Sequence, residues 1–203
     1  MPEPFPPLNF IRWKCIAETL VADVVVCRDN LSRSSLANNK IDQFWARAFV
    51  RAFFAYVESS IYEMRLVVRA AADSGRVTLN VAERSLIDEE SYELRENGKP
   101  EARPKFLKVE RNLRFTLDLF QRVFGIVANV DFGGDGWLSF LTAVKIRHRI
   151  THPRDPNAID LTLDEVATLV SAFGWYIQST DKVLTKAVEA VRLSIPDSSI
   201  RSD

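Results

Sequence analysis

The chain has 203 residues, of which 47% are hydrophobic and 27% are charged, a composition typical of one globular domain. Its 27 lysines and arginines balance its 27 aspartates and glutamates, so no overall charge draws it to nucleic acid or to a membrane, and any RNA contact has to be local. Cys15 and Cys27 are too few for a disulfide scaffold or a zinc site, and no apolar run reaches the length of a membrane span. We therefore expect a cytoplasmic protein with no membrane contact, no metal and no cofactor.

The start of the chain combines a proline-rich segment with a helical pattern. Residues 1–7 hold four prolines and are expected to form a flexible arm. From about Asn9 to Val26, apolar side chains recur at intervals of three and four, which predicts a helix. Residues 28–39 are polar and rich in serine and asparagine, so they either continue this helix or form a loop. The apolar positions are Phe10, Trp13, Ile16, Ala17, Leu20 and Val24.

The strongest helix pattern of the sequence runs from Lys40 to Ala71. Its apolar face is broad, and Asp42 lies near its start, where a carboxylate complements the helix dipole. A polar stripe on the same helix carries Glu58, and the outer arginines of this stripe are expected to be solvated and to form only weak ion pairs. The apolar face consists of Ile41, Phe44, Trp45, Ala48, Phe49, Ala52 and Phe53. The outer arginines are Arg47, Arg51, Arg65 and Arg69.

Residues 75–104 form the least helical part of the sequence. Residues 77–87 fit one short helix. Asn97 and Gly98 predict a tight turn, because both tolerate the positive φ that hairpin turns require. Pro100 and Pro104 limit the length of any strand. We expect a small irregular or hairpin insert here, which serves either as an exposed recognition loop or as a plain connection.

A helical pattern returns at about Lys105–Val130, where apolar side chains alternate at steps of three and four. They are expected to form a core seam against the helix of residues 40–71. Residues 131–136 contain three glycines but are followed by no Walker lysine and are too short for a calcium loop. We expect a turn there, with Asp135 as the N-cap of the next helix. The seam positions are Phe106, Val109, Leu113, Leu117, Phe120, Phe124 and Val127.

The last helix is expected to begin at residues 162–165, where Thr162 and Glu165 have the spacing of a capping box. Its apolar face reaches Val191, and Gly174 or residues 179–181 are positions where it can bend. Residues 196–203 are polar and are expected to form a flexible tail. Taken together, residues 1–203 are predicted to form a single all-α domain, a bundle of about five helices.

Residues 145–155 concentrate the chemistry of the chain, because they hold both of its histidines among a group of cations. Histidine exchanges protons near pH 7, and arginine binds phosphate oxygens. A charged helix end is also favoured by the helix dipole alone, by up to about 1 kcal/mol per cation, so a purely structural role stays open. The histidines and cations are Lys145, Arg147, His148, Arg149, His152 and Arg154. The buried stripe of this helix is predicted to comprise Trp137, Phe140, Leu141 and Val144, continued by His148.

Arg147, four intervening residues, His152 and then Pro153 resemble the Arg-x4–6-His motif of the HEPN superfamily (higher eukaryotes and prokaryotes nucleotide-binding domain). The resemblance covers roughly residues 40–190 and implies a HEPN-like helical bundle. Helices of this family often carry an acidic or polar residue that faces the motif, and Glu58 is the candidate for that role. Arg147 and His152 are about 140° apart on an ideal helix. The resemblance implies that two chains pair as a homodimer in which both motifs face one cleft.

The same resemblance implies a metal-independent endoribonuclease of the toxin or defence type, with a cognate inhibitor protein as a further partner. The ribose 2′-hydroxyl would attack the adjacent phosphate, with His152 as general acid or base and Arg147 stabilising the phosphate charge. His148 stands where the family most often has asparagine, so it is a second proton carrier, an orienting group or a packed imidazole. Arg149 and Arg154 would contact the RNA backbone.

A different class of function stays open beside the nuclease. The balanced charge, the missing asparagine and the scarcity of aromatic clusters for base stacking favour a catalytically silent HEPN-like module that binds a nucleotide or a protein. A structural helical protein with an accidental motif is the third alternative.

Overall fold

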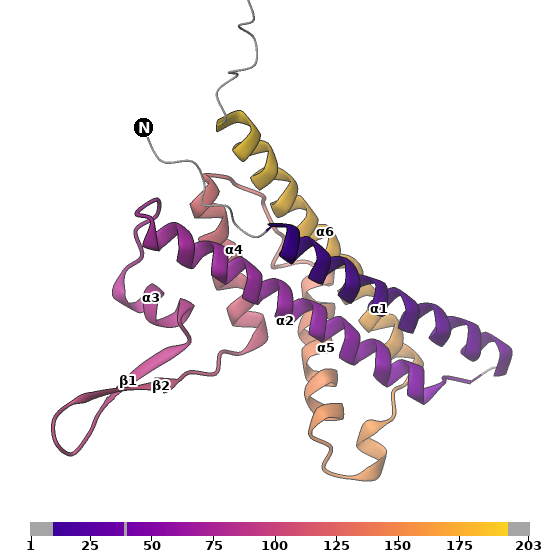
Figure 1. Ribbon diagram of the computed structural model, residues 1–203. Coiled ribbons are helices and arrows are strands. Elements are labelled where there is room, and N and C mark those ends of the chain that lie inside the picture. The colour runs from indigo at the N-terminus through magenta and orange to yellow at the C-terminus, as the bar shows by residue number, and fades with distance from the viewer. Residues whose placement is uncertain (1–9, 39, 195–203) are drawn as a thin grey trace, which may run out of the picture.

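A computed structural model describes residues 10–38 and 40–194 of the chain (Figure 1). Its described residues form six α-helices, one short 3-10 helix and one two-stranded sheet, which confirms the all-α prediction and the hairpin insert. None of these helices is both long enough and apolar enough to cross a membrane. The flexible arm predicted at residues 1–7 and the tail predicted at 196–203 lie outside the described residues. The elements are α1 (Phe10–Asn38), α2 (Gln43–Asp73), α3 (Val81–Ile87), β1 (Glu90–Leu94), β2 (Pro100–Pro104), α4 (Val109–Phe124), α5 (Asp135–Thr151), η1 (Pro156–Ile159) and α6 (Leu163–Ser194).

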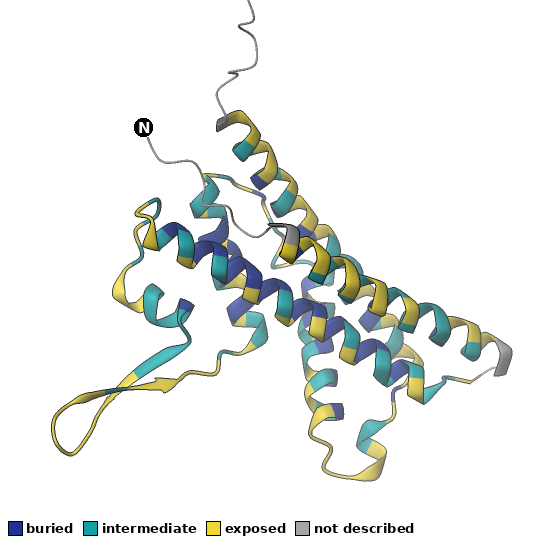
Figure 2. Cartoon of the chain, in the orientation of Figure 1, coloured by how far each residue is buried: buried dark blue, intermediate teal, exposed yellow. Residues whose placement is uncertain are grey.

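Helix α2 is the central element, and buried residues occur along almost its whole length (Figure 2). It begins at Asp42, whose carboxylate accepts the backbone N–H groups of Phe44 at 3.0 Å and Trp45 at 3.3 Å. Helix α1 runs antiparallel to α2 and covers one side of it, while α4, α5 and α6 pack on the other sides (Figure 1). Residues 28–38 belong to α1, so the helix continues through the polar segment whose structure the sequence left open.

Aromatic rings form the part of the core that joins α2 to α5 and α6. Phe53 of α2 is fully buried, and its ring lies 6.3 Å from that of Phe140, 5.5 Å from that of Phe173 and 6.0 Å from that of Tyr176. Removing one such ring from a protein core costs about 3–5 kcal/mol of stability. Burial also raises the pKa of the Tyr176 hydroxyl, which therefore stays protonated and neutral in the core.

Helix α4 is shorter than the predicted helix of residues 105–130, and two of the predicted seam residues are exposed. Lys105 N donates to Glu89 O, so the hairpin ladder extends to Lys105 and the helix starts only at Val109. Phe106 therefore lies outside the helix, and 96% of its surface is exposed. At the other end Gly125, with φ +63°, ends the helix in a left-handed conformation and leaves Val127 in solvent.

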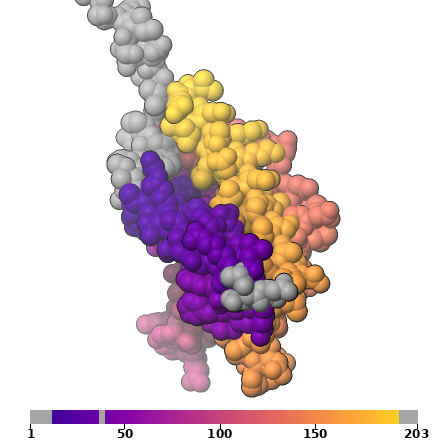
Figure 3. All heavy atoms as spheres, turned by 90° about the vertical axis from the view of Figure 1, so that its right-hand side faces the viewer, coloured from indigo at the N-terminus to yellow at the C-terminus, as the bar shows by residue number. Residues whose placement is uncertain are grey.

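The hairpin protrudes from the bundle and is attached at its base (Figures 1 and 3). Arg65 of α2 forms an ion pair with Glu89 and donates to the carbonyl oxygen of Ile87. The prediction that Arg65 is a solvated member of the polar stripe is therefore wrong, because its guanidinium is buried against the segment that leads into β1. Glu89 itself has φ +54°, a conformation that side chains other than glycine rarely adopt.

The loop before α5 is closed by Asp131. Its Oδ1 accepts the backbone N–H groups of Gly133 at 2.8 Å and Gly134 at 3.0 Å, and its carbonyl accepts Trp175 Nε1 at 3.1 Å. The N-cap residue of α5 is Gly134, and Asp135 is the first helical residue, so the prediction of Asp135 as N-cap is off by one position. The side chain that accepts backbone hydrogen bonds before α5 is therefore that of Asp131.

Helix α6 begins with the predicted capping box and runs without a break. Thr162 N donates to Glu165 Oε2 at 3.0 Å, and Glu165 N donates to Thr162 Oγ1 at 3.3 Å. The helix continues through Gly174 to Ser194. Together with α5 it forms the end of the bundle that holds both histidines.

The contact between α5 and α6 requires a glycine at position 136. A Cβ at Gly136 would lie 2.5 Å from Trp175 Cδ1, whereas a Cβ at Gly174 would meet nothing within 4 Å. We expect Gly136→Ala to lower the free energy of unfolding by about 1–3 kcal/mol. Gly174→Ala should be neutral or stabilising by up to about 1 kcal/mol. Urea denaturation followed by circular dichroism measures both, and equal midpoints would contradict this close approach.

Candidate active site

The end of α5 brings the two histidines together. Helix α5 ends at Thr151, and His152 is its C-cap, with φ −126° and ψ 63°. His152 N donates to His148 O at 3.0 Å, and Thr151 Oγ1 donates to Arg147 O at 2.7 Å, so the last carbonyls of the helix are partly satisfied. The imidazole rings of His148 and His152 have their centroids 5.2 Å apart, and both residues are exposed.

The prediction that His148 continues the buried stripe of α5 is wrong. Trp137 and Phe140 are buried as predicted, whereas His148 is exposed, one turn beyond half-buried Val144. The buried face of α5 shifts from Trp137 and Phe140 near its start to Ile146 and Ile150 near its end, which leaves His148 on the open side of the helix. A packed core imidazole is thereby excluded as the role of His148.

Arg147 reaches back to α2 and forms an ion pair with Glu58. The distance from Arg147 Nη2 to Glu58 Oε1 is 2.7 Å, and the two side chains are 32% and 45% exposed. This contact confirms the prediction that Glu58 lies within reach of the motif. Because the pair is only partly covered, it contributes little to stability, about 0–1 kcal/mol. The pair places the guanidinium against α2.

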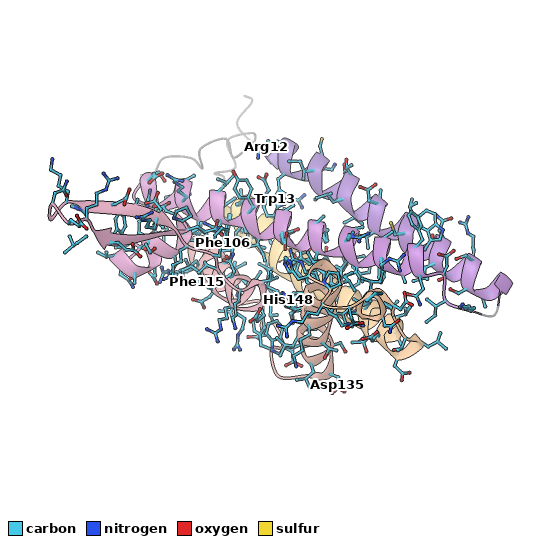
Figure 4. The ribbon with its side chains drawn as sticks, turned by 90° about the horizontal axis from the view of Figure 1, so that it is seen from below. Arg12, Trp13, Phe106, Phe115, Asp135 and His148 are labelled. Carbon is cyan, nitrogen blue, oxygen red and sulfur yellow. The ribbon has the colours of Figure 1, made fainter. Side chains whose placement is uncertain are left out.

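Arg147 and His148 line a groove between α5 and the start of α4, with a volume of about 640 Å³. A second, smaller cavity of about 320 Å³ lies beside it and shares Leu107 and Val109 with it. In the view from below, Phe106 lies between the hairpin and His148 (Figure 4). The groove is lined by Leu107, Lys108, Val109, Glu110, Leu141, Val144, Lys145, Arg147 and His148. The smaller cavity is lined by Glu58, Ile61, Tyr62, Arg65, Glu89, Phe106, Leu107, Val109 and Asn112.

His152 is not among the residues that line the groove. Arg147 and His152 are separated by about 140° around an ideal helix, and His152 lies at the C-cap with non-helical φ and ψ. Within one chain, Arg147 therefore contacts Glu58 and shares the groove with His148, whereas His152 adjoins the site through the ring of His148.

Arg149 is engaged in the scaffold. Its Nη1 donates to the carbonyl oxygen of Asp160 at 3.0 Å, and its Nη2 donates to Glu165 Oε1 at 2.7 Å. Glu165 is the capping-box residue of α6, so one carboxylate joins the end of α5 to the start of α6. In this structure the guanidinium predicted to contact RNA is bonded to the protein. Arg154 is exposed in the loop that follows α5.

The site offers proton carriers and a cation beside a groove of ligand size. Pockets for small ligands usually span about 300–1,000 Å³, so the groove can take a nucleotide-sized group. Among the described residues, no group of three or more histidine, cysteine or carboxylate side chains has the arrangement of a metal site. No sequence pattern predicts Leu107 or Tyr62 as lining residues, because both lie outside the helix that carries the motif.

Comparison of the chain with protein-family models, with curated proteins and with solved structures finds no match.

The contacts of the two arginines predict different effects on stability. Arg149→Ala removes a hydrogen bond to a carbonyl and one to a carboxylate, so we expect a loss of about 1–2 kcal/mol in the free energy of unfolding. Arg147→Ala removes only the partly exposed pair with Glu58 and should cost less than about 1 kcal/mol. Chemical denaturation of the two variants measures the difference. A larger loss for Arg147→Ala would mean that this residue belongs to the scaffold.

Proposed function

We propose that the protein is a HEPN-like, metal-independent endoribonuclease that acts as a homodimer. The observation that carries the proposal is the position of Arg147: Glu58 holds its guanidinium at 2.7 Å beside a groove that His148 also lines, with the His152 ring 5.2 Å from that of His148. A fixed cation next to proton-transferring side chains is the set of groups that RNA cleavage by internal attack requires. The toxin or defence role, with a cognate inhibitor, rests on the resemblance of the motif alone.

In the proposed reaction the ribose 2′-oxygen forms a bond to the adjacent phosphorus, and the bond from phosphorus to the 5′-oxygen breaks. One imidazole takes the proton from the 2′-hydroxyl, and a second gives a proton to the departing 5′-oxygen. Arg147 stabilises the negative charge that builds on the phosphate oxygens. The products are a 2′,3′-cyclic phosphate and a 5′-hydroxyl.

The dimer is part of the proposal because one chain does not direct Arg147 and His152 to the same point. A two-fold axis near the end of α5 would place the His152 of one copy near the Arg147 of the other. The cleft would then hold two arginines and four histidines. Glu58 keeps each arginine in place until a phosphate group competes for it.

A catalytically silent HEPN-like module is the second candidate. It is favoured by the lining of the groove, in which Leu107, Val109, Leu141 and Val144 are apolar and Glu110 adds a negative charge. The 27 cationic and 27 acidic side chains also give no general attraction for RNA. Such a module would bind a nucleotide or a protein at the groove without cleaving anything.

Cleavage of RNA is the direct test. We expect cleavage to persist in excess EDTA and to leave 2′,3′-cyclic ends, because the proposed chemistry uses imidazole and guanidinium groups only. His152→Ala should lower the rate by about 10²–10⁴-fold, the usual range for a general acid or base. Arg147→Ala should lower it by a comparable factor. Labelled RNA of several sequences, analysed by gel and by end-group chemistry, measures both.

His148→Asn separates two roles of this residue. The change restores the residue that is usual in the family at this position, so activity should persist if His148 only orients other groups. It should fall by about 10²-fold or more if His148 transfers a proton. Wild-type protein that cleaves no RNA above the level of His152→Ala would reject the nuclease and leave the silent module.

A further inference from the structure

The hairpin has two chemically different faces. Strands β1 and β2 are antiparallel with Glu90 opposite Pro104, so side chains at even positions share one face and those at odd positions share the other. The odd face is charged and holds ion pairs of Arg103 with Glu93 and Glu101. The even face is apolar apart from Glu90, and it comprises Glu90, Tyr92, Leu94, Pro100, Ala102 and Pro104.

The apolar face of the hairpin is open to solvent. Tyr92 is 63% exposed and Leu94 is 77% exposed, and the hairpin extends away from the helices (Figure 2). An isolated two-stranded hairpin is marginally stable in water and gains stability when one face packs on another surface. Its polar face is already occupied by ion pairs, so the apolar face is the one that lacks a partner among the described residues.

The apolar face leads directly to the groove of the candidate active site. Pro104 at the end of β2 is followed by Phe106, which is almost fully exposed, and by Leu107, which lines the groove. The protruding hairpin and the apolar groove are therefore joined by the short segment of residues 105–107. The net charges are also opposite, because Glu90 is the single charged side chain of the apolar face, whereas the groove carries Lys108, Lys145 and Arg147 against one carboxylate, Glu110.

We propose that the hairpin is a dimerisation arm: in a homodimer, the apolar face of the hairpin and Phe106 of each copy pack on the Val144 side of the groove of the other and leave the side of Arg147 and His148 open to substrate. This inference rests on the dimer of the proposed function and names its contact surface. A two-fold axis requires a self-complementary surface, and a surface that carries both a protrusion and a groove meets this requirement. The arm of the partner would then form one wall of the site, so each groove is complete only in the dimer.

Sedimentation equilibrium of the full chain tests the arm. We expect wild type to be a dimer, and Phe106→Ser or the double change Tyr92→Ser/Leu94→Ser to raise the dimer dissociation constant by about tenfold or more, as loss of central apolar contacts does. Phe44→Ser is the matched control, because Phe44 is also an exposed phenylalanine but lines neither cavity. Far-ultraviolet circular dichroism verifies that each variant is folded.

Mixing two variants tests whether the arm of one copy binds the groove of the other. Val144→Glu damages the groove wall and keeps the arm, whereas Phe106→Ser damages the arm and keeps the groove. Each protein alone should be mostly monomeric. An equal mixture should recover part of the dimer, because a mixed pair keeps one intact arm in one intact groove.

Two results would overturn the proposal: a monomeric wild type at tens of micromolar, and a dimer that the hairpin variants leave unchanged. If these variants also lost affinity for a single-stranded RNA probe, the surface would be a nucleic-acid site instead. Sedimentation measures the dimer without RNA, so this test does not depend on nuclease activity. A stable dimer that depends on the hairpin but cleaves no RNA would contradict the proposed nuclease and still support the dimerisation arm.

Discussion

Aromatic rings from three helices meet around Phe53, and their contact determines where the end of α5 lies. Phe140 is the α5 member of this cluster, and it stacks on Tyr176 of α6 with ring centroids 6.0 Å apart. Interiors of this density transmit small displacements, because neighbouring side chains leave little room for adjustment. The position of Arg147, two turns further along α5, therefore depends on packing to which Arg147 itself contributes almost nothing.

The two arginines in the last turns of α5 have different surroundings. Arg149 is bonded to Asp160 and Glu165 and joins the helix to the start of α6. Arg147 is paired with Glu58, a carboxylate that is itself half exposed. A rigid attachment on one side of the helix and an accessible guanidinium on the other is the arrangement that a binding site on a helix end needs.

Some of this structure follows from local sequence, and some does not. The course of α2, the capping box at Thr162 and the hairpin turn at Asn97 and Gly98 depend on neighbours within a few residues, so their patterns predict them. The exposure of Phe106 and His148 does not. Helical spacing gives the face on which a side chain lies, whereas the end of the neighbouring element decides whether anything covers that face. Glu58 was identifiable as the acidic partner only through the resemblance.

The register of the hairpin also limits how these molecules can associate. Odd positions exchange the ladder hydrogen bonds, as Lys105 N with Glu89 O does, so the N–H groups of even positions point outward. On the outer edge of β2 two of the three even positions, 100 and 104, are prolines and have no N–H to donate. Along this edge, another strand therefore finds only one backbone N–H donor, that of Ala102, among these three positions. The hairpin can therefore pack through the side chains of its apolar face while its β2 edge disfavours the strand-by-strand addition that builds a fibre.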